Sequence, residues 1–260
     1  MVVIFDIEAS CADRKLNPNY NMETIEIGAV KVDRNKIIDT FQTFIKPEYI
    51  DDLTPYCTKL TGITFKDLEN APSFNQAIIE FHHFIKDYVI YSCGNFDKKF
   101  LINELLEKGT TYEHLLAKNA IKSSHKDLKR LFSQITNEQK SGMIKMAQIL
   151  DIELKGVHHR ALDDAVNLAN IYIELENIRE KRLLKTFSKK FNRIVKSLND
   201  NHNYELNVID ENDIISTEGR YTFLEFVDNW ADIMITDTLE RKLNYISMQE
   251  VSILRRFAKL

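Results

Sequence analysis

The stretch FDIEAS, from Phe5 to Ser10, ends an apolar run and carries two acids, Asp6 and Glu8. Its β-branched and aromatic residues predict a strand over Met1 to Ala9. Side chains two residues apart in a strand lie on one face, about 6.6 Å apart, so the two carboxylates project together. Neighbouring negative charges repel each other and resist desolvation. The stretch therefore indicates either solvated acids at a strand end or one half of a cation site.

The chain beyond this stretch has the pattern of an α/β domain. Two β-rich segments, Thr24–Asp33 and Lys36–Lys46, flank a short turn and predict a hairpin, which gives a three-stranded meander with the first strand. Helical and strand-like patterns then alternate. They predict helices around Phe74–Ile85, Phe96–Glu107, 125–134, 140–150 and 161–180, and a strand at 88–94. This order predicts a mixed β-sheet flanked by helices.

The composition is that of a globular protein. Of the 260 residues, 44% are apolar and 28% are charged. We find no run of about 18 apolar residues and no signal-peptide pattern, so we expect a cytoplasmic protein that does not bind membranes. The three cysteines, Cys11, Cys57 and Cys93, are widely spaced, which argues against a disulfide framework or a thiolate zinc site.

Charge is distributed unevenly, although the net charge is only −4. Residues 179–198 carry eight Lys or Arg and one Glu, whereas residues 199–260 carry six basic and twelve acidic residues. Helical spacing continues through both segments. We therefore predict a domain at 1–178, a basic helical connector at 179–198 and a small helical C-terminal extension at 199–260. The connector could follow a nucleic-acid backbone or pack on the acidic extension.

Two further acids point towards the interior of the predicted domain. Asp97 opens a helix and shares a face with Leu101, so it is either an N-terminal cap or part of a site. Asp164 shares a helical face with Leu168, whereas Asp163 lies on the polar face. An inward acid needs a partner, and a cation shared with the two strand acids would supply one.

Two adjacent histidines, His158 and His159, precede the helix of Asp164. A loop histidine can be a surface residue or a cap, and either of these two could also reach the edge of a site at Asp164. Helical periodicity does not rank them.

Three short motifs, FDIEAS (5–10), GNFDKKFL (94–101) and HHRALDDA (158–165), together resemble those of the DEDDh 3′-to-5′ exonucleases. This superfamily includes RNase T and the exonuclease domain of DNA polymerase III epsilon. The stretches LTPYCTKLTGIT (53–64) and SGMIKMAQILDIELKGVHHRALDDA (141–165) resemble the Eri-type and KapD-like subgroup. The resemblance covers residues 1–178 and does not extend to the C-terminal extension.

The resemblance implies a ribonuclease H-like fold and an activity. The enzyme would be a metal-dependent 3′-to-5′ exonuclease that hydrolyses phosphodiester bonds at the 3′ end of single-stranded RNA or DNA and releases 5′-mononucleotides. Two Mg²⁺ or Mn²⁺ ions, about 3.5–4 Å apart, would activate water and neutralise charge on the phosphate. Carboxylate oxygens suit these hard ions.

The resemblance also assigns the catalytic residues. Asp6, Glu8, Asp97 and Asp164 would be the four acids, and His159, rather than its neighbour, would be the base. Asp6, Glu8 and Asp164 would bind the ions directly, and Asp97 mainly through water.

Contacts with the 3′ nucleotide follow from the same resemblance. Ala9 and Ser10 would approach it through the backbone, and Leu60, Thr61 and Ile63 would pack on the last bases, which suits single-stranded ends. Leu60 and Ile63 could equally be ordinary core residues.

Two other functions remain open at this point. The chain could be an inactive nucleic-acid-binding module of the same fold, although all five catalytic positions are filled. It could also be a proofreading subunit held by a polymerase. The amphipathic C-terminal extension permits a protein partner or self-association, and it identifies neither.

Overall fold

The computed structural model describes residues 1–202, except 14, 18 and 34, and three short strands between residues 207 and 221. Side chains are described as far as residue 182, apart from residue 180. The chain forms two compact units, residues 1–181 and 182–260, and each is described by itself. In the described part of the chain, no helix combines the length and apolar composition needed to cross a membrane.

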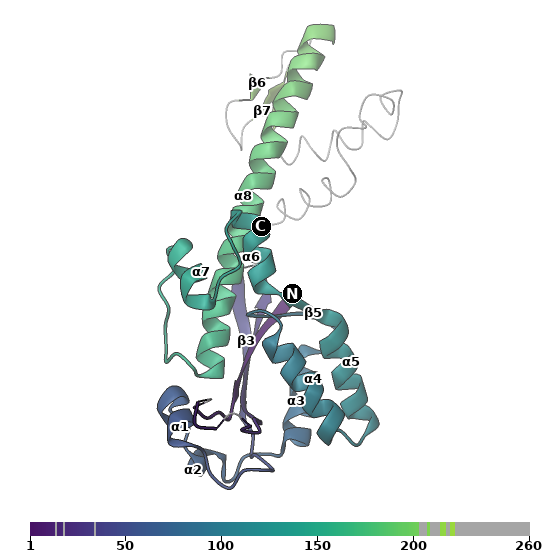
Figure 1. The fold of residues 1–260 in the computed structure, drawn as a ribbon. Coiled ribbons are helices and arrows are strands. Elements are labelled where there is room, and N and C mark those ends of the chain that lie inside the picture. The colour runs from purple at the N-terminus through teal and green to yellow at the C-terminus, as the bar shows by residue number, and fades with distance from the viewer. Residues whose placement is uncertain are drawn as a thin grey trace. The chain divides into compact units, whose positions relative to one another are not determined.

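A five-stranded mixed sheet forms the centre of the first unit (Figure 1). Its strands are β1 (Val2–Ala9), β2 (Thr24–Asp33), β3 (Lys36–Phe44), β4 (Val89–Ser92) and β5 (His125–Asp127), in the spatial order β3-β2-β1-β4-β5. β2 is antiparallel to β1 and β3, whereas β4 is parallel to β1 and β5. Because β1 and β4 are parallel neighbours, their carboxyl ends meet at one edge of the sheet, where the first and second motifs lie.

Helices cover both faces of this sheet. They are α1 (Pro55–Thr61), α2 (Phe65–Leu68), α3 (Phe74–Ile85), α4 (Phe96–Lys108), α5 (Tyr112–Ser124), α6 (Leu128–Thr136), α7 (Met143–Ile149) and α8 (Ala161–His202), which continues beyond this unit. Apolar residues of α3, α4 and α5 pack on one face, and those of α6, α7 and α8 on the other (Figure 1). α1 and α2 contribute to a smaller cluster with Ile25 of β2.

The alternation of side chains along β1 decides which face carries its acids. Val3, Phe5 and Ile7 belong to the core with α3, α4 and α5, whereas Ile4 belongs to the core with α6, α7 and α8. Even-numbered residues of β1 therefore lie on the α8 face. Asp6 and Glu8 follow Ile4 in this alternation, so they project towards the helix that carries the third motif.

The mixed sheet, its hairpin and the flanking helices confirm the predicted fold class, with one local error. Residues 125–134 were predicted as a helix, but His125–Asp127 form β5 and pair with β4. The Asp127 side chain accepts hydrogen bonds from the backbone N–H groups of Lys129 and Arg130, so it caps α6 and ends the strand. The sequence did not lead us to predict α1, α2 or α5.

The described part of the second unit contains a small antiparallel sheet. Its strands are β6 (Asn207–Val208), β7 (Ile214–Ser216) and β8 (Gly219–Tyr221). The helical segments expected after residue 222 lie outside the described residues. The proposed limits at residues 178 and 198 stay predictions.

Candidate active site

Three carboxylates converge where the edge of the sheet meets the start of α8. Asp6, Glu8 and Asp164 each place an oxygen within 4.8 Å of those of the other two. Glu8 and Asp164 are only 8% and 5% exposed. The structure thus brings together three of the acids that the sequence motifs suggested, from segments more than 150 residues apart.

A glycine allows the helix to come this close to the sheet. Gly28 lies opposite Asp6 in the β1–β2 pair. A Cβ atom at Gly28 would lie 2.2 Å from the carbonyl carbon of Ala161 and 2.2 Å from the nitrogen of Leu162. The first turn of α8, which carries Asp164, therefore packs directly on the β2 backbone.

A buried acid fixes the start of the same helix. Glu26 is fully buried opposite Glu8. Its carboxylate accepts hydrogen bonds from Arg160, at 3.0 Å from Nη2 and 3.2 Å from Nε, and from the Ala161 backbone N–H at 3.0 Å. Gln42 donates a further bond from β3 at 2.6 Å. Glu26 therefore caps α8 and attaches the third motif to the central sheet.

Two of the three acids retain protons more readily than exposed carboxylates do. Burial, followed by repulsion from Asp97, Glu8 and Asp164, raises the pKa of Asp6 well above its usual value. Burial and then Asp164 raise the pKa of Glu8 to about 8. Such shifts arise where negative charges lack a compensating cation, and perturbed carboxylates of this kind are typical of functional sites.

Asp97 is buried at the start of α4 and lies outside the group that meets within 4.8 Å. Burial raises its pKa to about 6, although a hydrogen bond with Ser92 and the charge of Lys129 act in the opposite direction. Lys129 lies close to Gly94, three residues before Asp97: a Cβ atom added at Gly94 would be 3.5 Å from Lys129 Nζ. Lys129 is thus a basic residue whose charge acts on Asp97.

Both histidines lie at the site, in different positions. Nδ1 of His158 is 3.0 Å and 3.1 Å from the two carboxylate oxygens of Asp164. His159 donates its backbone N–H to Asp164 at 3.2 Å, and its Nδ1 lies 4.0 Å from Glu8. The two rings stack with centroids 4.0 Å apart. Burial and the neighbouring His158 lower the pKa of His159.

His159 adopts a backbone conformation that few residues other than glycine take, with φ at +65°. The ring thereby lies on the Glu8 side of the site while the backbone N–H faces Asp164. Strain of this kind is often found at functional sites.

The residues that we expected to contact substrate are mostly buried. Ala9 is 8% exposed, Ser10 is fully buried, and Thr61 and Ile63 are 1% exposed, whereas Leu60 is 39% exposed. Ile63 packs in the small apolar cluster beside β2, as the core interpretation predicts. Of these five side chains, Leu60 is the one that a nucleotide reaches without a change in the structure.

The acids fit a hard divalent ion. They offer carboxylate oxygens within one ion's reach, Glu8 and Asp164 are buried, and burial together with repulsion from the neighbouring acids raises the pKa values of Asp6 and Glu8. Mg²⁺ and Mn²⁺ prefer such oxygen ligands. Asp6, Glu8 and Asp164 can therefore hold a divalent ion, with Asp97 next to them.

Comparison with known proteins agrees with this geometry. The family described as Exonuclease (RNase_T) matches residues 3–172, which include all three motifs. The chain belongs to this family. The matched part of this RNase T-type exonuclease domain ends within α8.

Relatives of the exonuclease domain occur in large and small proteins. The DNA polymerase III PolC-type of Caldanaerobacter subterraneus subsp. tengcongensis is 33% identical over 180 residues, which are 68% of this chain but 12% of that protein. The probable 3′-5′ exonuclease KapD of Bacillus subtilis is 26% identical over 183 residues, or 69% of this chain and 86% of KapD. The chain thus spans about an eighth of its PolC-type relative and most of KapD.

Solved structures share the fold. The nuclease domain of 3′hExo, a DEDDh family member solved with rAMP bound, superposes with a TM-score of 0.58 at 23% identity over 68% of this chain and 91% of that one. Pop2p of S. pombe, solved in a form that binds Mg²⁺ and Mn²⁺, gives a TM-score of 0.52 at 18% identity over 67% of this chain and 82% of that one. The ribonuclease H-like fold expected from the sequence is therefore confirmed.

Sequence reasoning missed Glu26 and Gly28, which both hold α8 against the sheet. A signal was present, because Glu26 is an acid within an apolar strand and Arg160 directly precedes the helix that carries the third motif. Nothing in the sequence paired these two residues. Gly28 carried only the general signal that a glycine within a strand often marks close backbone approach.

Proposed function

We propose that the protein is a metal-dependent 3′-to-5′ exonuclease that shortens single-stranded nucleic acid and releases 5′-mononucleotides. The observation that carries this proposal is the meeting of Asp6, Glu8 and Asp164 within 4.8 Å, in a domain of the exonuclease family. KapD, most of whose length this chain covers, is described as a probable 3′-5′ exonuclease.

In this proposal Asp6, Glu8 and Asp164 would hold two Mg²⁺ or Mn²⁺ ions, and Asp97 would act through water. Bound in this way, the ions supply an activated water and neutralise the charge that develops on the phosphate and on the leaving 3′ oxygen. The chain itself supplies the fixed carboxylate positions, because α8 is attached to β2 at Gly28 and Glu26.

His159 is the proposed general base. Its ring lies beside Glu8, with Nδ1 at 4.0 Å from that carboxylate, and a neutral imidazole accepts a proton near neutral pH. His158 is bonded to Asp164 instead. Its proposed role is to orient that carboxylate.

The proposed substrate is a strand with a free 3′ end, either RNA or DNA. Backbone atoms of Ala9 and Ser10 would face the terminal nucleotide, and Leu60 would lie under the last bases, with the buried Thr61 and Ile63 supporting it from the core. The exposed edge of Leu60 supports this arrangement. A cytoplasmic location, and a protein partner or self-association through residues 199–260, belong to the same proposal.

A second candidate function is proofreading beside a DNA polymerase. The identity of 33% with a PolC-type polymerase supports it. Co-purification of the full chain with a replicative polymerase would favour this role. Recovery of the chain without a polymerase, together with activity on RNA, would contradict it.

The proposed activity can be tested on a panel of strands. Purified protein is incubated with 5′-labelled single-stranded RNA and DNA carrying either a free 3′ hydroxyl or a 3′-terminal block. We expect a ladder that shortens from the free 3′ end in Mg²⁺ or Mn²⁺, and intact strands where the end is blocked. Internal cleavage, or full activity in excess chelator, would contradict the proposal.

A further inference from the structure

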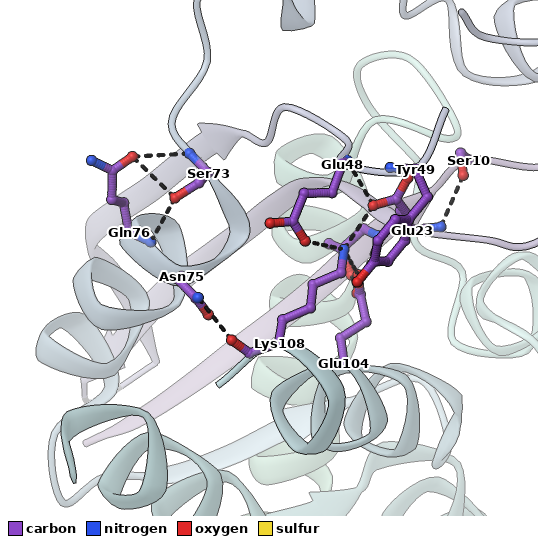
Figure 2. A network of polar contacts seen from close by, with 10 residues as sticks. Ser10, Glu23, Glu48, Tyr49, Ser73, Asn75, Gln76, Glu104 and Lys108 are labelled. Carbon is purple, nitrogen blue, oxygen red and sulfur yellow. Dashed lines mark hydrogen bonds and ion pairs between the residues drawn. The ribbon is translucent and has the colours of Figure 1, made fainter. Parts of the chain in front are cut away.

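A second cluster of charged residues, separate from the carboxylates of the active site, forms a buried polar network (Figure 2). It consists of Lys108, Glu23 and Glu104, whose side chains are 4%, 1% and 6% exposed. Lys and Glu are rarely buried to this extent unless they are paired. The sequence analysis assigned these three residues no role.

The lysine joins the two acids. Lys108 Nζ donates to Glu23 at 2.7 Å and to Glu104 at 3.0 Å. The Glu23 carboxylate also accepts the backbone N–H groups of Glu48 and Tyr49 at 2.7 Å and 2.9 Å. Burial lowers the pKa of Lys108, but the bonds to Glu23 and Glu104 outweigh this effect and raise it. The ammonium group therefore stays charged.

The acids bind the backbone next to the first motif. Glu104 accepts bonds from the backbone N–H and the hydroxyl of Thr24. Glu23 exchanges two bonds with Ser10: the Ser10 N–H donates to the Glu23 carbonyl at 2.7 Å, and the Glu23 N–H donates to the Ser10 hydroxyl at 2.9 Å. Figure 2 shows Ser10 turned towards Glu23 in this way. The fully buried Ser10 side chain thus contacts the Glu23 backbone.

The cluster therefore connects two elements that carry site residues. Lys108 and Glu104 lie in the last turns of α4, whose first turn carries Asp97. Ser10 lies two residues after Glu8, beyond an irregularity in the β1–β2 pairing between Glu8 and Ala9. Because regular pairing is interrupted at that point, the end of β1 could shift if Ser10 were not fixed by other contacts.

Stability alone does not account for such a cluster. A buried ion pair gives little net stability compared with well-packed apolar residues of similar volume. The two carboxylates, however, also bind the backbone N–H groups of Thr24, Glu48 and Tyr49 and the Thr24 hydroxyl. Such bonds fix geometry because each contact is directional.

We propose that Lys108 is a positioning residue for the metal-binding acids: through Glu23 and Glu104 it holds the end of β1, and hence Glu8, at a set position relative to Asp97 on α4. This proposal rests on the proposed metal-dependent function. It predicts that loss of the Lys108 contacts weakens metal binding while the fold and the acids themselves are retained.

The test compares Lys108→Met with the double variant Lys108→Met/Glu23→Gln. The single variant leaves two buried carboxylates without their cation and is expected to lose stability. In the double variant the side-chain carbonyl of the new amide still accepts the N–H groups of Glu48 and Tyr49, and Glu104 keeps its bonds to Thr24. The fold is therefore retained while the link that Lys108 makes between Glu23 and α4 is lost. Lys31→Met, which removes the Lys31–Asp39 bond of 2.9 Å from the sheet, is the matched control.

Metal binding is measured directly from the electron paramagnetic resonance signal of free Mn²⁺, with unfolding by urea in parallel. We expect the double variant to bind Mn²⁺ about tenfold more weakly than the wild type, at the lower end of the range for residues that support metal ligands. Its exonuclease rate should recover at high Mn²⁺. Lys31→Met should bind Mn²⁺ like the wild type.

A second comparison separates positioning from general loosening. In a Glu8→Gln background, the double substitution should weaken Mn²⁺ binding little further, because the ligand that it positions is already altered. Equal Mn²⁺ affinity of the double variant and Lys31→Met would overturn the inference, as would an undiminished effect in the Glu8→Gln background. Failure of the wild type itself to bind Mn²⁺ would instead contradict the proposed function.

Discussion

Arg160 binds Glu26 through two hydrogen bonds, at 3.0 Å and 3.2 Å, and thereby joins the residue before α8 to the strand next to Glu8. The Ala161 backbone N–H donates to the same carboxylate. A single buried acid thus sets where the third motif begins relative to the first. The proposed catalytic arrangement therefore depends on Glu26, although this residue lies outside the motifs.

Replacement of Glu26 should therefore affect both stability and metal binding. Both carboxylate oxygens of Glu26 accept hydrogen bonds. Glu26→Gln replaces one of them with an NH₂ group, which cannot accept a hydrogen bond. We expect a loss of about 2 kcal/mol in the free energy of unfolding, less than the roughly 3–5 kcal/mol for a fully buried pair, because the Arg160 side chain is 28% exposed. Urea unfolding measures this change. Asp39→Asn, in an exposed ion pair of the same sheet, is the control and should change little; equal losses in the two variants would contradict the role of Glu26.

Gly28 gives a second prediction. A methyl group there would lie 2.2 Å from the Ala161 backbone, so Gly28→Ala must displace the first turn of α8 and Asp164 with it. A misplacement of about 1 Å can cost about 100-fold in rate. We expect a loss of this order in exonuclease turnover. Gly142→Ala, where no atom lies within 4 Å of the added carbon, should retain turnover, and similar rates in both variants would refute the close-packing argument.

The raised pKa values predict how the metal-free protein responds to pH. Burial and then Asp164 raise the Glu8 pKa from 4.5 to about 8, so between these values the folded state keeps a proton that the unfolded state has lost. Stability should then fall as pH rises through this window, by at most about 1.4 kcal/mol per pH unit for each such group. Urea unfolding in chelator at pH 5 to 8 measures the slope.

Divalent ions should reverse this dependence, because they replace the protons as partners of the carboxylates. Mg²⁺ or Mn²⁺ is expected to stabilise the protein more near the upper end of this pH window than near its lower end, and Glu8→Gln should flatten the slope seen in chelator. Stability of the metal-free protein that does not fall across the window, or a slope that Glu8→Gln leaves unchanged, would contradict the raised pKa of Glu8.

The sequence predicted the parts of the site that follow from periodicity and motif spacing. Alternation along β1 places Asp6 and Glu8 on one face, and helical spacing directs Asp164 inward rather than Asp163. These local rules are physical, so they hold wherever the elements form. The fold class followed from the order of strands and helices.

Contacts between distant segments were not predictable in the same way. Glu26 with Arg160, Gly28 with Ala161, and Lys108 with Glu23 each join residues at least 85 positions apart. No local pattern pairs such residues, because only the packed fold brings them together. Residues 125–127 were misassigned for a related reason, since their pairing with β4 outweighs the helical pattern that follows them.

The two histidines are expected to differ in their effect on rate. His159→Ala should lower turnover by about 100-fold or more, as loss of a general base does, because its ring lies beside Glu8. His158→Ala should weaken apparent metal affinity and lower turnover much less at saturating metal, since it contacts Asp164. Steady-state kinetics at several Mn²⁺ concentrations separate these effects. Equal loss of turnover in the two variants would show that the base is misassigned.

The most direct test of the central claim is the single-turnover rate of Asp6→Asn on a 5′-labelled single strand in saturating Mn²⁺. This substitution preserves the size of the side chain and removes the charge of one of the three proposed metal ligands. We predict a rate at least about 1,000-fold below that of the wild type, with the folded structure retained. A rate close to that of the wild type would contradict the proposal that Asp6, Glu8 and Asp164 form the catalytic metal site.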